Sequence, residues 1–531
     1  MNTGPVFLAA AAAAALLAGV PAASAASSAS APVVVSDRSA SPLAACTADD
    51  AASQPGIDFT NAEVEPYVAV NPTNPQNVVA VWQQDRWRNG GSRGNIIASS
   101  FDGGLRWTTV TATKSSACTG GTSANGGDLP RASDPWLSFA PNGDLYLATL
   151  AARASSLRQP GSDGIVETAL LVSKSTDGGL TWSDPATLIR EGCSALNDKE
   201  SITADPANPG FAYVVWSRYA FPTGTANASC TGARNAEISS DADGAASFTA
   251  PVWFTRTTDG GVTWQPPRAI YPVHQGVGTS ENQIVVLPRS GELLDVFVLI
   301  TADKNAAGQR GAALALIRST DRGATWSDAQ IIGPIDSVGY HDPFTGAPIR
   351  NGDNLAVAID PRTGTLYAAW EDGRFSGGAN GDIALTMSTD GGLTWATPVK
   401  ANRTPASLDP GNRQAFVPAL AVGADGSVAV SYYDLRFNGT DNSASDPLET
   451  DRFVAHCTSP SMSEPDLCAG DWAETRLTPT SFDLRAAPNV RGGLFLGDYE
   501  GLASLQTGFG ALFTESADAA DPASIYFATV H

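Results

Sequence analysis

One position recurs at the entrance of seven apolar segments, and most of its occupants can carry or accept a proton. It lies seven residues before the proline, or its equivalent, of the turn that follows each segment. The occupants are Glu65, Asp134, Lys199, Glu281, Asn354, Val417 and Tyr499. A phenol has a pKa of about 10 and becomes a nucleophile when a neighbouring carboxylate takes its proton. The pattern predicts a central site with Glu281 and Tyr499 facing a shared centre; an ordinary polar loop is the alternative.

A second recurring pattern could bind a substrate. An arginine with an aromatic neighbour follows the second strand of four units. The copies are Asp85-Arg86-Trp87, Ser217-Arg218-Tyr219, Asp372-Gly373-Arg374-Phe375 and Asp434-Leu435-Arg436-Phe437. Each arginine either braces neighbouring groups through charge-assisted bonds or points into the mouth and holds a substrate carboxylate. Both interpretations stay open, and Arg86, Arg374 and Arg436 are the candidates for substrate binding.

The elements that must position these residues are β-hairpins. An apolar strand, a turn of Pro, Asn, Asp and Gly, and a second apolar strand recur from about residues 66, 135, 201, 283, 355, 416 and 501. After the first 25 residues no helical periodicity of any length appears. The expected fold class is therefore all-β.

A turn motif, Ser/Thr-x-Asp-x-Gly-x-x-Trp, closes the first five units. Its aspartates are Asp102, Asp177, Asp259, Asp321 and Asp390. Asp and Ser/Thr side chains can hydrogen-bond turn amides, Gly accepts a positive φ, and Trp can wedge between neighbouring hairpins. We expect these aspartates to be structural and to lie on the face opposite the site.

A four-stranded sheet repeated around an axis is a β-propeller. We therefore expect residues 62–531 to form one propeller of four-stranded blades. The seven hairpins favour seven blades, whereas the five turn motifs alone would allow six.

The N-terminus has the composition of a secretory signal. An apolar, Ala-rich run over residues 6–20 precedes a small-residue cleavage pattern that ends at Ala25. The run is too short to span a membrane. We expect a signal peptide over residues 1–25, a flexible arm rich in Ala, Ser and Pro over 26–61, and a secreted, monomeric extracellular protein without a membrane span.

Secretion would allow disulfides, and the six cysteines are even in number and form no CxxC pair. Plausible bridges are Cys457 with Cys468, Cys193 with Cys230, and Cys46 with Cys118, although spacing does not fix the connectivity.

Composition and motifs argue against several functions. A net charge of -22 with only 32 basic residues opposes binding to nucleic acid or anionic membranes. The four histidines are scattered, which leaves little material for a zinc site or a Ser-His-Asp triad. Asp241-Ala-Asp243-Gly could bind Ca²⁺, but the glutamate of a complete calcium loop is missing, so we expect no metal and no cofactor.

The turn motif and hairpin pattern resemble the sialidase (neuraminidase) superfamily, also called BNR-repeat or Asp-box proteins, over about residues 60–531. The segment from Ser280 to Leu294 is similar to the family segment with an activating glutamate. The segment from Asp498 to Glu515 resembles the one with the tyrosine nucleophile and a later glutamate. The resemblance implies Tyr499 as nucleophile, Glu281 as its base and Asp85 or Asp134 as acid/base.

The family also binds the sialate carboxylate with three arginines, and this triad is not matched. Val64-Glu65-Pro66-Tyr67 stands where the family has its first arginine, and the position after the activating glutamate falls near Val296 or Phe297. Arg86, Arg374 and Arg436 are the substitutes that the sequence offers, with Glu65 and Glu515 as further substrate contacts.

Three functions follow as hypotheses. The first is a secreted exo-α-sialidase-like glycoside hydrolase acting on terminal acidic sugars of glycans. The second is a non-catalytic propeller that binds glycans or proteins. The third is a hydrolase of neutral sugars, which the acidic residues Glu65, Asp134 and Glu281 would suit.

Overall fold

The computed structural model describes Met1 and residues 28–155, 164–192, 195–220, 249–304, 310–350, 354–439, 442–458, 460–461, 467–468, 472–518 and 520–531. Within them the chain is all-β, as expected, and its only helical segments are five short 3-10 turns. These are η1 (Ala51–Ser53), η2 (Ala117–Thr119), η3 (Arg374–Ser376), η4 (Pro410–Arg413) and η5 (Leu484–Ala486). No helix of this part of the chain has the length and apolar character needed to cross a membrane. Nearly all of the expected signal peptide and the Asp241–Asp243 loop lie outside the described residues.

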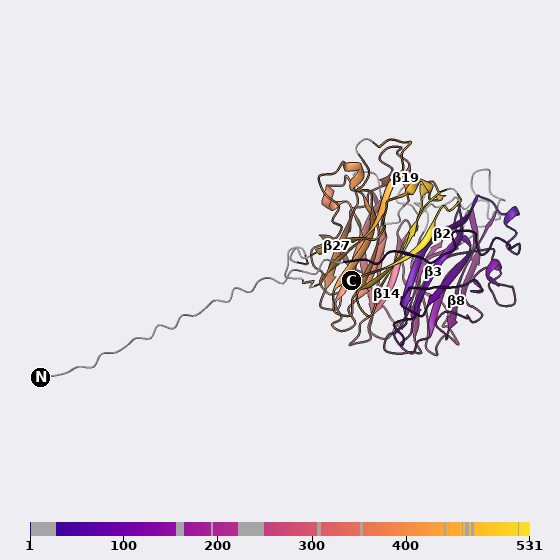
Figure 1. Cartoon of the computed structure of the whole chain (residues 1–531). Helices are drawn as coiled ribbons and strands as arrows, with labels where there is room; N and C mark the ends of the chain where they lie inside the picture. Colours follow the sequence, from indigo (N-terminus) through magenta and orange to yellow (C-terminus); the bar gives the residue numbers. More distant parts are fainter. Residues whose placement is uncertain are drawn as a thin grey trace.

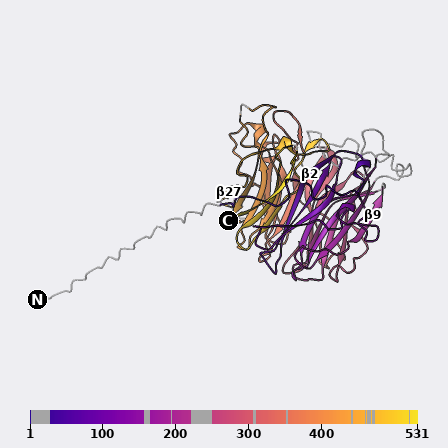
Figure 2. The same ribbon diagram turned by 45° about the vertical axis from the view of Figure 1, so that its right-hand side comes forward.

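Antiparallel units of four strands follow one another along the chain (Figures 1 and 2), and the first two units are joined into one eight-stranded sheet by the pairing of β4 with β6. The first half contains β2 (Asp58–Val70), β3 (Val78–Trp87), β4 (Ser92–Ser100) and β5 (Thr108–Val110); β6 (Arg131–Phe139), β7 (Leu145–Ser155), β8 (Gly164–Ser175) and β9 (Ala186–Gly192); β10 (Ala195–Ala204), β11 (Ala212–Ala220), β12 (Val252–Thr257) and β13 (Arg268–Tyr271); and β14 (Gly278–Val286), β15 (Leu293–Lys304), β16 (Arg310–Ser319) and β17 (Gln330–Ile335).

The second half continues the series. It contains β20 (Leu355–Ile359), β21 (Leu366–Asp372), β22 (Asp382–Ser388) and β23 (Val399–Lys400); β24 (Ala415–Val422), β25 (Val428–Asp434), β26 (Glu449–Cys457) and β27 (Trp472–Arg476), with β28 (Phe482–Asp483) also on β26; and β31 (Gly501–Ser504), β32 (Phe509–Glu515), β33 (Ser524–Val530) and β1 (Val33–Val34).

The first strands of these sheets are neighbours in chain order. β2 contacts β6, β6 contacts β10, and the series continues through β14, β20 and β24 to β31, which contacts β2. The large side chains Trp82, Trp216 and Trp370 come from the second strands and are buried in apolar clusters. Sheets that face one another across such clusters are consistent with a β-propeller.

The repeated turn motif has a structural role. In its first copy Asp102 Oδ1 accepts hydrogen bonds from the backbone N–H groups of Leu105 and Arg106 at 3.1 and 2.9 Å, and Ser100 Oγ accepts one from Gly104 N at 2.8 Å. The indole of Trp107 donates to the Gly104 carbonyl at 3.0 Å. The carboxylate thus accepts hydrogen bonds from the backbone of its own turn, as expected.

The segment expected to be a flexible arm contributes to the last sheet instead. Its Val33–Val34 strand, β1, pairs antiparallel with β33, and Val35 N donates to the Ile525 carbonyl at 2.8 Å. Arg38 also pairs with Asp521 at 2.6 Å. Composition did not reveal this because two residues of strand leave no periodic pattern.

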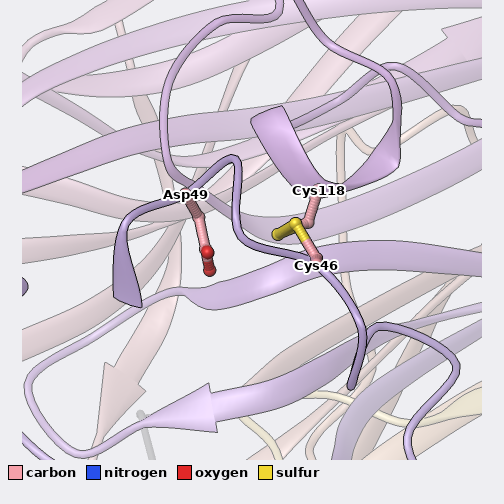
Figure 3. A group of neighbouring side chains, drawn as sticks. All are labelled: Cys46, Asp49 and Cys118. Carbon is pink, nitrogen blue, oxygen red and sulfur yellow. A yellow bond between two sulfur atoms is a disulfide. The ribbon is translucent and has the colours of Figure 1, made fainter. Parts of the chain in front are cut away.

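Two of the three expected disulfides are present. Cys46 is bonded to Cys118, and Cys457 to Cys468; Cys193 and Cys230 lie outside the described residues. Figure 3 shows Asp49 beside the first bridge. Among the described residues, one group of three potential metal ligands has a spacing that could hold a metal ion: Cys46, Asp49 and Cys118. The disulfide, however, occupies both sulfurs. The bridges are consistent with an oxidising compartment.

A small extra sheet stands apart from the repeats. It joins β18 (Tyr340–His341), β19 (Pro348–Ile349), β30 (Gly493–Leu494) and β29 (Asn489–Val490), and β19 pairs with β30 in parallel. β19 lies at the upper end of the molecule in Figure 1. Two segments far apart in sequence thereby bring Arg350 and Arg491 to one place.

Candidate active site

Five of the seven occupants of the recurring position found in the sequence share a backbone geometry. Glu65, Asp134, Lys199, Glu281 and Val417 have φ values of 54°, 46°, 58°, 54° and 52°. In each case the pairing of the first and second strands shifts register at this point, so the residue sits at an irregularity of the β-bulge kind. A left-handed conformation costs a non-glycine residue about 1–2 kcal/mol, and such strain concentrates at functional sites.

Ion pairs and one hydrogen bond link three of the first strands to the segment before β31. Lys199 Nζ lies 2.9 Å from Glu281 Oε1 and 2.8 Å from Asp498 Oδ2, and Arg350 Nη2 lies 2.9 Å from the same Asp498 oxygen. The backbone N–H of Asp498 donates to Glu65 Oε1 at 3.1 Å. The side chains of these groups therefore form one connected cluster.

Burial and neighbouring charge set the protonation of this cluster. Burial alone would raise the pKa of Asp498, but Arg350 and Lys199 hold that pKa well below its usual range. Burial raises the pKa of Glu281 to about 7 although the Lys199 ammonium opposes it. Burial, and then the Asp134 and Asp498 charges, raise the pKa of Glu65 to about 8. The cluster thus contains both a firmly ionised carboxylate and carboxyl groups that hold protons near neutral pH.

Tyr499 lies against an aromatic wall. Its ring meets Trp136 edge-on with centroids 5.4 Å apart, and Trp136 stacks on Tyr67 at 4.1 Å. Its hydroxyl donates to the Pro135 carbonyl at 3.1 Å. Burial, and then the nearby Glu65 and Asp134 charges, raise the pKa of this phenol well above its usual value. The group is therefore a neutral phenol, and its hydrogen bond goes to the Pro135 carbonyl.

A small pocket brings these residues together. It is lined by Asp134, Trp136, Lys199, Glu200, Ser201, Glu281, Asn282, Gln283 and Tyr499. The space that a water molecule can enter is about 10 Å³, which is room for about one water.

Glu200 is the most isolated acid of the pocket. Its side chain is buried, and neither carboxyl oxygen has a hydrogen-bond partner among the described residues. Burial, and then the charge of Asp134, raise its pKa well above the usual value. Burial therefore favours the protonated form of Glu200.

Arg86, Arg350 and Arg491 gather beside the cluster. The Arg86 and Arg350 guanidiniums lie 5.0 and 4.4 Å from the same Phe495 ring, and Arg86 Nη1 lies 3.8 Å from Glu65. Both of their charges act on Arg491, whose side chain is exposed. Arg350 Nη1 is buried without a hydrogen-bond partner in the described structure. The site therefore has three arginines, of which the sequence offered only Arg86.

Two other sequence candidates act as braces. Arg374 binds Asp372 of its own unit at 2.7 Å, and Arg436 binds Asp434 and Glu474, each at 2.6 Å. The Arg436 guanidinium also stacks 3.7 Å from the Phe453 ring. These contacts match the bracing interpretation of the repeated arginine pattern.

The remaining two candidates lie among other partners. Asp85 accepts hydrogen bonds from Ser41 Oγ at 2.6 Å and Asn61 N at 2.8 Å, which places its carboxylate against the N-terminal segment. Glu515 is near Arg38, and burial raises its pKa to about 7. Neither residue lines the pocket.

The structure adds acids that sequence reasoning missed. Asp198, Lys199 and Glu200 are consecutive ionisable residues at the entrance of an apolar strand, and Asp498 directly precedes Tyr499. Those runs were a usable signal. No sequence signal marked Arg350 or Arg491, because each directly follows a strand of the extra sheet and lies outside the repeats.

Comparisons with known proteins give likenesses of structure at low identity. No family model matches the sequence, and no curated protein matches it. The leech intramolecular trans-sialidase in complex with 2,7-anhydro-Neu5Ac is 12% identical, with a TM-score of 0.43, 95% of this chain covered and 98% of that one. The intramolecular trans-sialidase of Ruminococcus gnavus is 14% identical, with a TM-score of 0.39 and coverage of 89% and 95%. The GH93 α-L-arabinofuranosidase of Fusarium graminearum is 12% identical, with a TM-score of 0.43 and coverage of 77% and 93%. At this level of similarity, the function has to be sought in the side chains of the site.

Proposed function

We propose that the chain is a secreted glycoside hydrolase of the sialidase type, built as a closed propeller of seven blades. The contact of β31 with β2 supports closure, and so does the pairing of β1 with β33. The sequential contacts of the first strands favour seven blades over six. The two disulfides suit an exported protein.

The observation that carries the proposed activity is one pocket that contains a phenol and three carboxyl groups. Tyr499, Asp134, Glu200 and Glu281 line it together. A phenol can attack an anomeric carbon, one carboxylate can take the phenol proton, and another carboxyl can protonate the leaving oxygen. Tyrosine serves as the nucleophile in sialidases, which depart from the usual pair of carboxylates.

In this mechanism Tyr499 Oη forms the bond to the anomeric carbon and Glu281 accepts the phenol proton. A pKa of about 7 makes Glu281 a better acceptor than an ordinary carboxylate. In the unliganded protein the phenol donates to Pro135 and Glu281 pairs with Lys199. Substrate binding has to turn the hydroxyl toward Glu281, and catalytic hydrogen bonds often tighten only in the complex.

The arginines favour an acidic sugar. Arg350 Nη1 is buried without a hydrogen-bond partner among the described residues, and the Arg491 side chain is exposed nearby. A substrate carboxylate would satisfy both guanidiniums through charge-assisted hydrogen bonds. A neutral phenol nucleophile would then avoid repulsion with that carboxylate.

The test is hydrolysis of a fluorogenic sialoside beside a panel of neutral aryl glycosides, with wild type and Tyr499→Phe. We expect release from the sialoside only, and loss of that release in Tyr499→Phe. Release from neutral sugars alone would replace the acidic substrate with a neutral one. No release from any substrate, with retained binding on a glycan array, would make the chain a binding module.

A second candidate, hydrolysis of neutral sugars, is favoured by a surplus of acids around the pocket. The acids are Glu65, Asp134, Asp198, Glu200, Glu281 and Asp498, and the bases are Arg86, Lys199, Arg350 and Arg491. A neutral sugar would need no counter-charge and could hydrogen-bond the protonated carboxyl groups.

A further inference from the structure

Four charged side chains form one series of contacts between the extra sheet and the pocket. Arg350 Nη2 and Lys199 Nζ lie 2.9 and 2.8 Å from the same oxygen, Asp498 Oδ2. Lys199 Nζ also lies 2.9 Å from Glu281 Oε1, and both of these residues line the pocket with Tyr499. The exposed fractions of the four side chains are 21% for Arg350, 5% for Asp498, 15% for Lys199 and 7% for Glu281. Arg350 is therefore the member most open to a ligand, and Glu281 ends the series at the pocket.

The two carboxyl groups of this series bind their cations differently. Asp498 Oδ2 accepts hydrogen bonds from both Arg350 Nη2 and Lys199 Nζ. Asp498 Oδ1 is buried and has no hydrogen-bond partner among the described residues. Glu281 Oε1 meets the Lys199 ammonium as an ion pair, without the geometry of a hydrogen bond. Of the two contacts that Lys199 makes, the one with Glu281 is therefore the more easily released.

We propose that Asp498 and Lys199 are positioning residues that connect substrate binding to proton transfer. They couple a substrate carboxylate at Arg350 to the base Glu281. A substrate carboxylate shares the Arg350 charge with Asp498, so that Asp498 depends more on Lys199. The ammonium then neutralises Glu281 less, and Glu281 becomes a stronger acceptor for the Tyr499 proton. This inference rests on the proposed hydrolase function and extends it to the way in which the site responds to an acidic sugar.

The charges around Glu281 agree with this coupling. Burial raises the pKa of Glu281 to about 7; the Lys199 ammonium opposes the rise, and the Asp498 and Asp134 charges add to it. The charged and titratable groups around Glu281 are Asp134 of β6, Lys199 and Glu200 of β10, Tyr219 of β11, and Asp498 and Tyr499 before β31. Lys199 is the cation of this set. A change in how Lys199 divides its charge between Asp498 and Glu281 therefore changes the proton affinity of Glu281 directly.

The first test separates substrate binding from proton transfer. Asp498→Asn releases Arg350 for the substrate carboxylate and leaves Lys199 to neutralise Glu281 alone, which weakens the base. On a sialoside we expect KM to fall or stay unchanged while kcat falls about tenfold to a hundredfold. Steady-state kinetics measures both constants, and thermal unfolding checks that the variant is folded. A rise in KM would overturn the role of Asp498, because a general loss of order in the site weakens substrate binding as well.

The second test removes the cation. Lys199→Met should lower kcat/KM about tenfold to a hundredfold at neutral pH and shift the acidic limb of its pH profile to higher pH, because Glu281 then keeps its proton to higher pH. Lys199→Arg keeps the charge and should restore most of the activity. The matched control is Lys400→Met, which removes an ion pair of 2.6 Å to the buried Asp382 outside the pocket and should leave the profile unchanged. An acidic limb unmoved in Lys199→Met would overturn the proposal.

A third readout does not need turnover. Binding of N-acetylneuraminate to the wild type near pH 7 should take up a proton, because the bound carboxylate raises the proton affinity of Glu281. Calorimetry in buffers of different ionisation enthalpy measures this uptake, which Glu281→Gln and Asp498→Asn should lose. Binding without proton uptake would overturn the coupling and leave the hydrolase function standing. A wild type that neither hydrolyses a sialoside nor binds N-acetylneuraminate would instead remove the proposed function, and the coupling with it.

Discussion

Two regions of the molecule repeat an acidic residue from sheet to sheet and use it in opposite ways. In the turns, Asp102 is surrounded by backbone donors, and the hydrogen bond from Arg106 N leads the effects that lower its pKa. At the entrances of the first strands, Glu65 and Glu281 are buried, and burial raises their pKa values to about 8 and about 7.

The difference lies in what surrounds the carboxyl group rather than in the residue type. Where turn amides donate, the charged form of the carboxyl group is favoured. Where burial dominates and donors are few, the acid keeps its proton and can pass it on. Repetition alone therefore does not distinguish a structural acid from an acid of the site, whereas the surroundings of the carboxyl group do.

Removal of the proposed nucleophile should have the largest effect on kcat/KM. Tyr499→Phe should lower kcat/KM on a sialoside by about 10²–10⁴-fold, because the attacking oxygen is lost while the ring stays against Trp136. Steady-state kinetics measures it, with thermal unfolding as the check on folding. Full activity in this variant would show that the pocket is not the reacting site.

The arginines of the site and the arginines that brace a blade should also respond differently to substitution. Arg350→Gln should raise KM for an acidic sugar about tenfold to a hundredfold, since a charge-assisted contact is lost. The matched Arg374→Gln removes a brace to Asp372 and should leave KM unchanged while lowering the melting temperature. Equal KM values for both variants would contradict the assignment of Arg350.

Asp295 is a buried acid outside the site, so its substitution should measure how burial of a carboxyl group affects the free energy of unfolding. Asp295 is 0% exposed, its carboxyl oxygens have no hydrogen-bond partner among the described residues, and burial raises its pKa well above the usual value. The unfolded chain releases this proton near pH 4, so the native state loses stability as pH rises above that. Urea unfolding should show Asp295→Asn within error of wild type at pH 4, and more stable by about 1–3 kcal/mol at pH 8. A pH-independent difference would mean that Asp295 is ionised in the folded protein.

The smallest effect belongs to the turns. Asp177→Ala removes hydrogen bonds from Leu180 N and Thr181 N at 3.1 and 2.9 Å and should cost about 1 kcal/mol in unfolding free energy without changing kcat/KM. Asp184→Ala, which loses only a salt bridge to Lys114, is the control and should cost less. A fall in activity for Asp177→Ala would contradict the assignment of a purely structural role to the turn aspartates.

Periodic features were readable from the sequence. The all-β class, the hairpins and the turn motif followed from repeated patterns, and the recurring position correctly grouped Asp134, Lys199, Glu281 and Tyr499 around one pocket. Each of these depends on local spacing, which the pleat of a strand and the geometry of a turn translate directly into position.

Non-periodic features were not readable. Ile349 and Leu494 meet in a parallel pair across 145 residues, and this pairing delivers Arg350 to the site. The sequence could not place Asp85, Arg374 and Arg436, because a side chain after a strand can turn toward the centre or toward its own neighbours, and only packing decides which.

The pairing of β1 with β33 couples the biosynthesis of this protein to its folding. Ser28 and His531 exchange backbone hydrogen bonds at 3.1 and 2.9 Å, next to the strand pair. During translation Val33 and Val34 therefore have no partner strand until residues 524–530 of β33 have left the ribosome. β1 is the outer strand of the last sheet, so this sheet can be completed only after β33 has been synthesised.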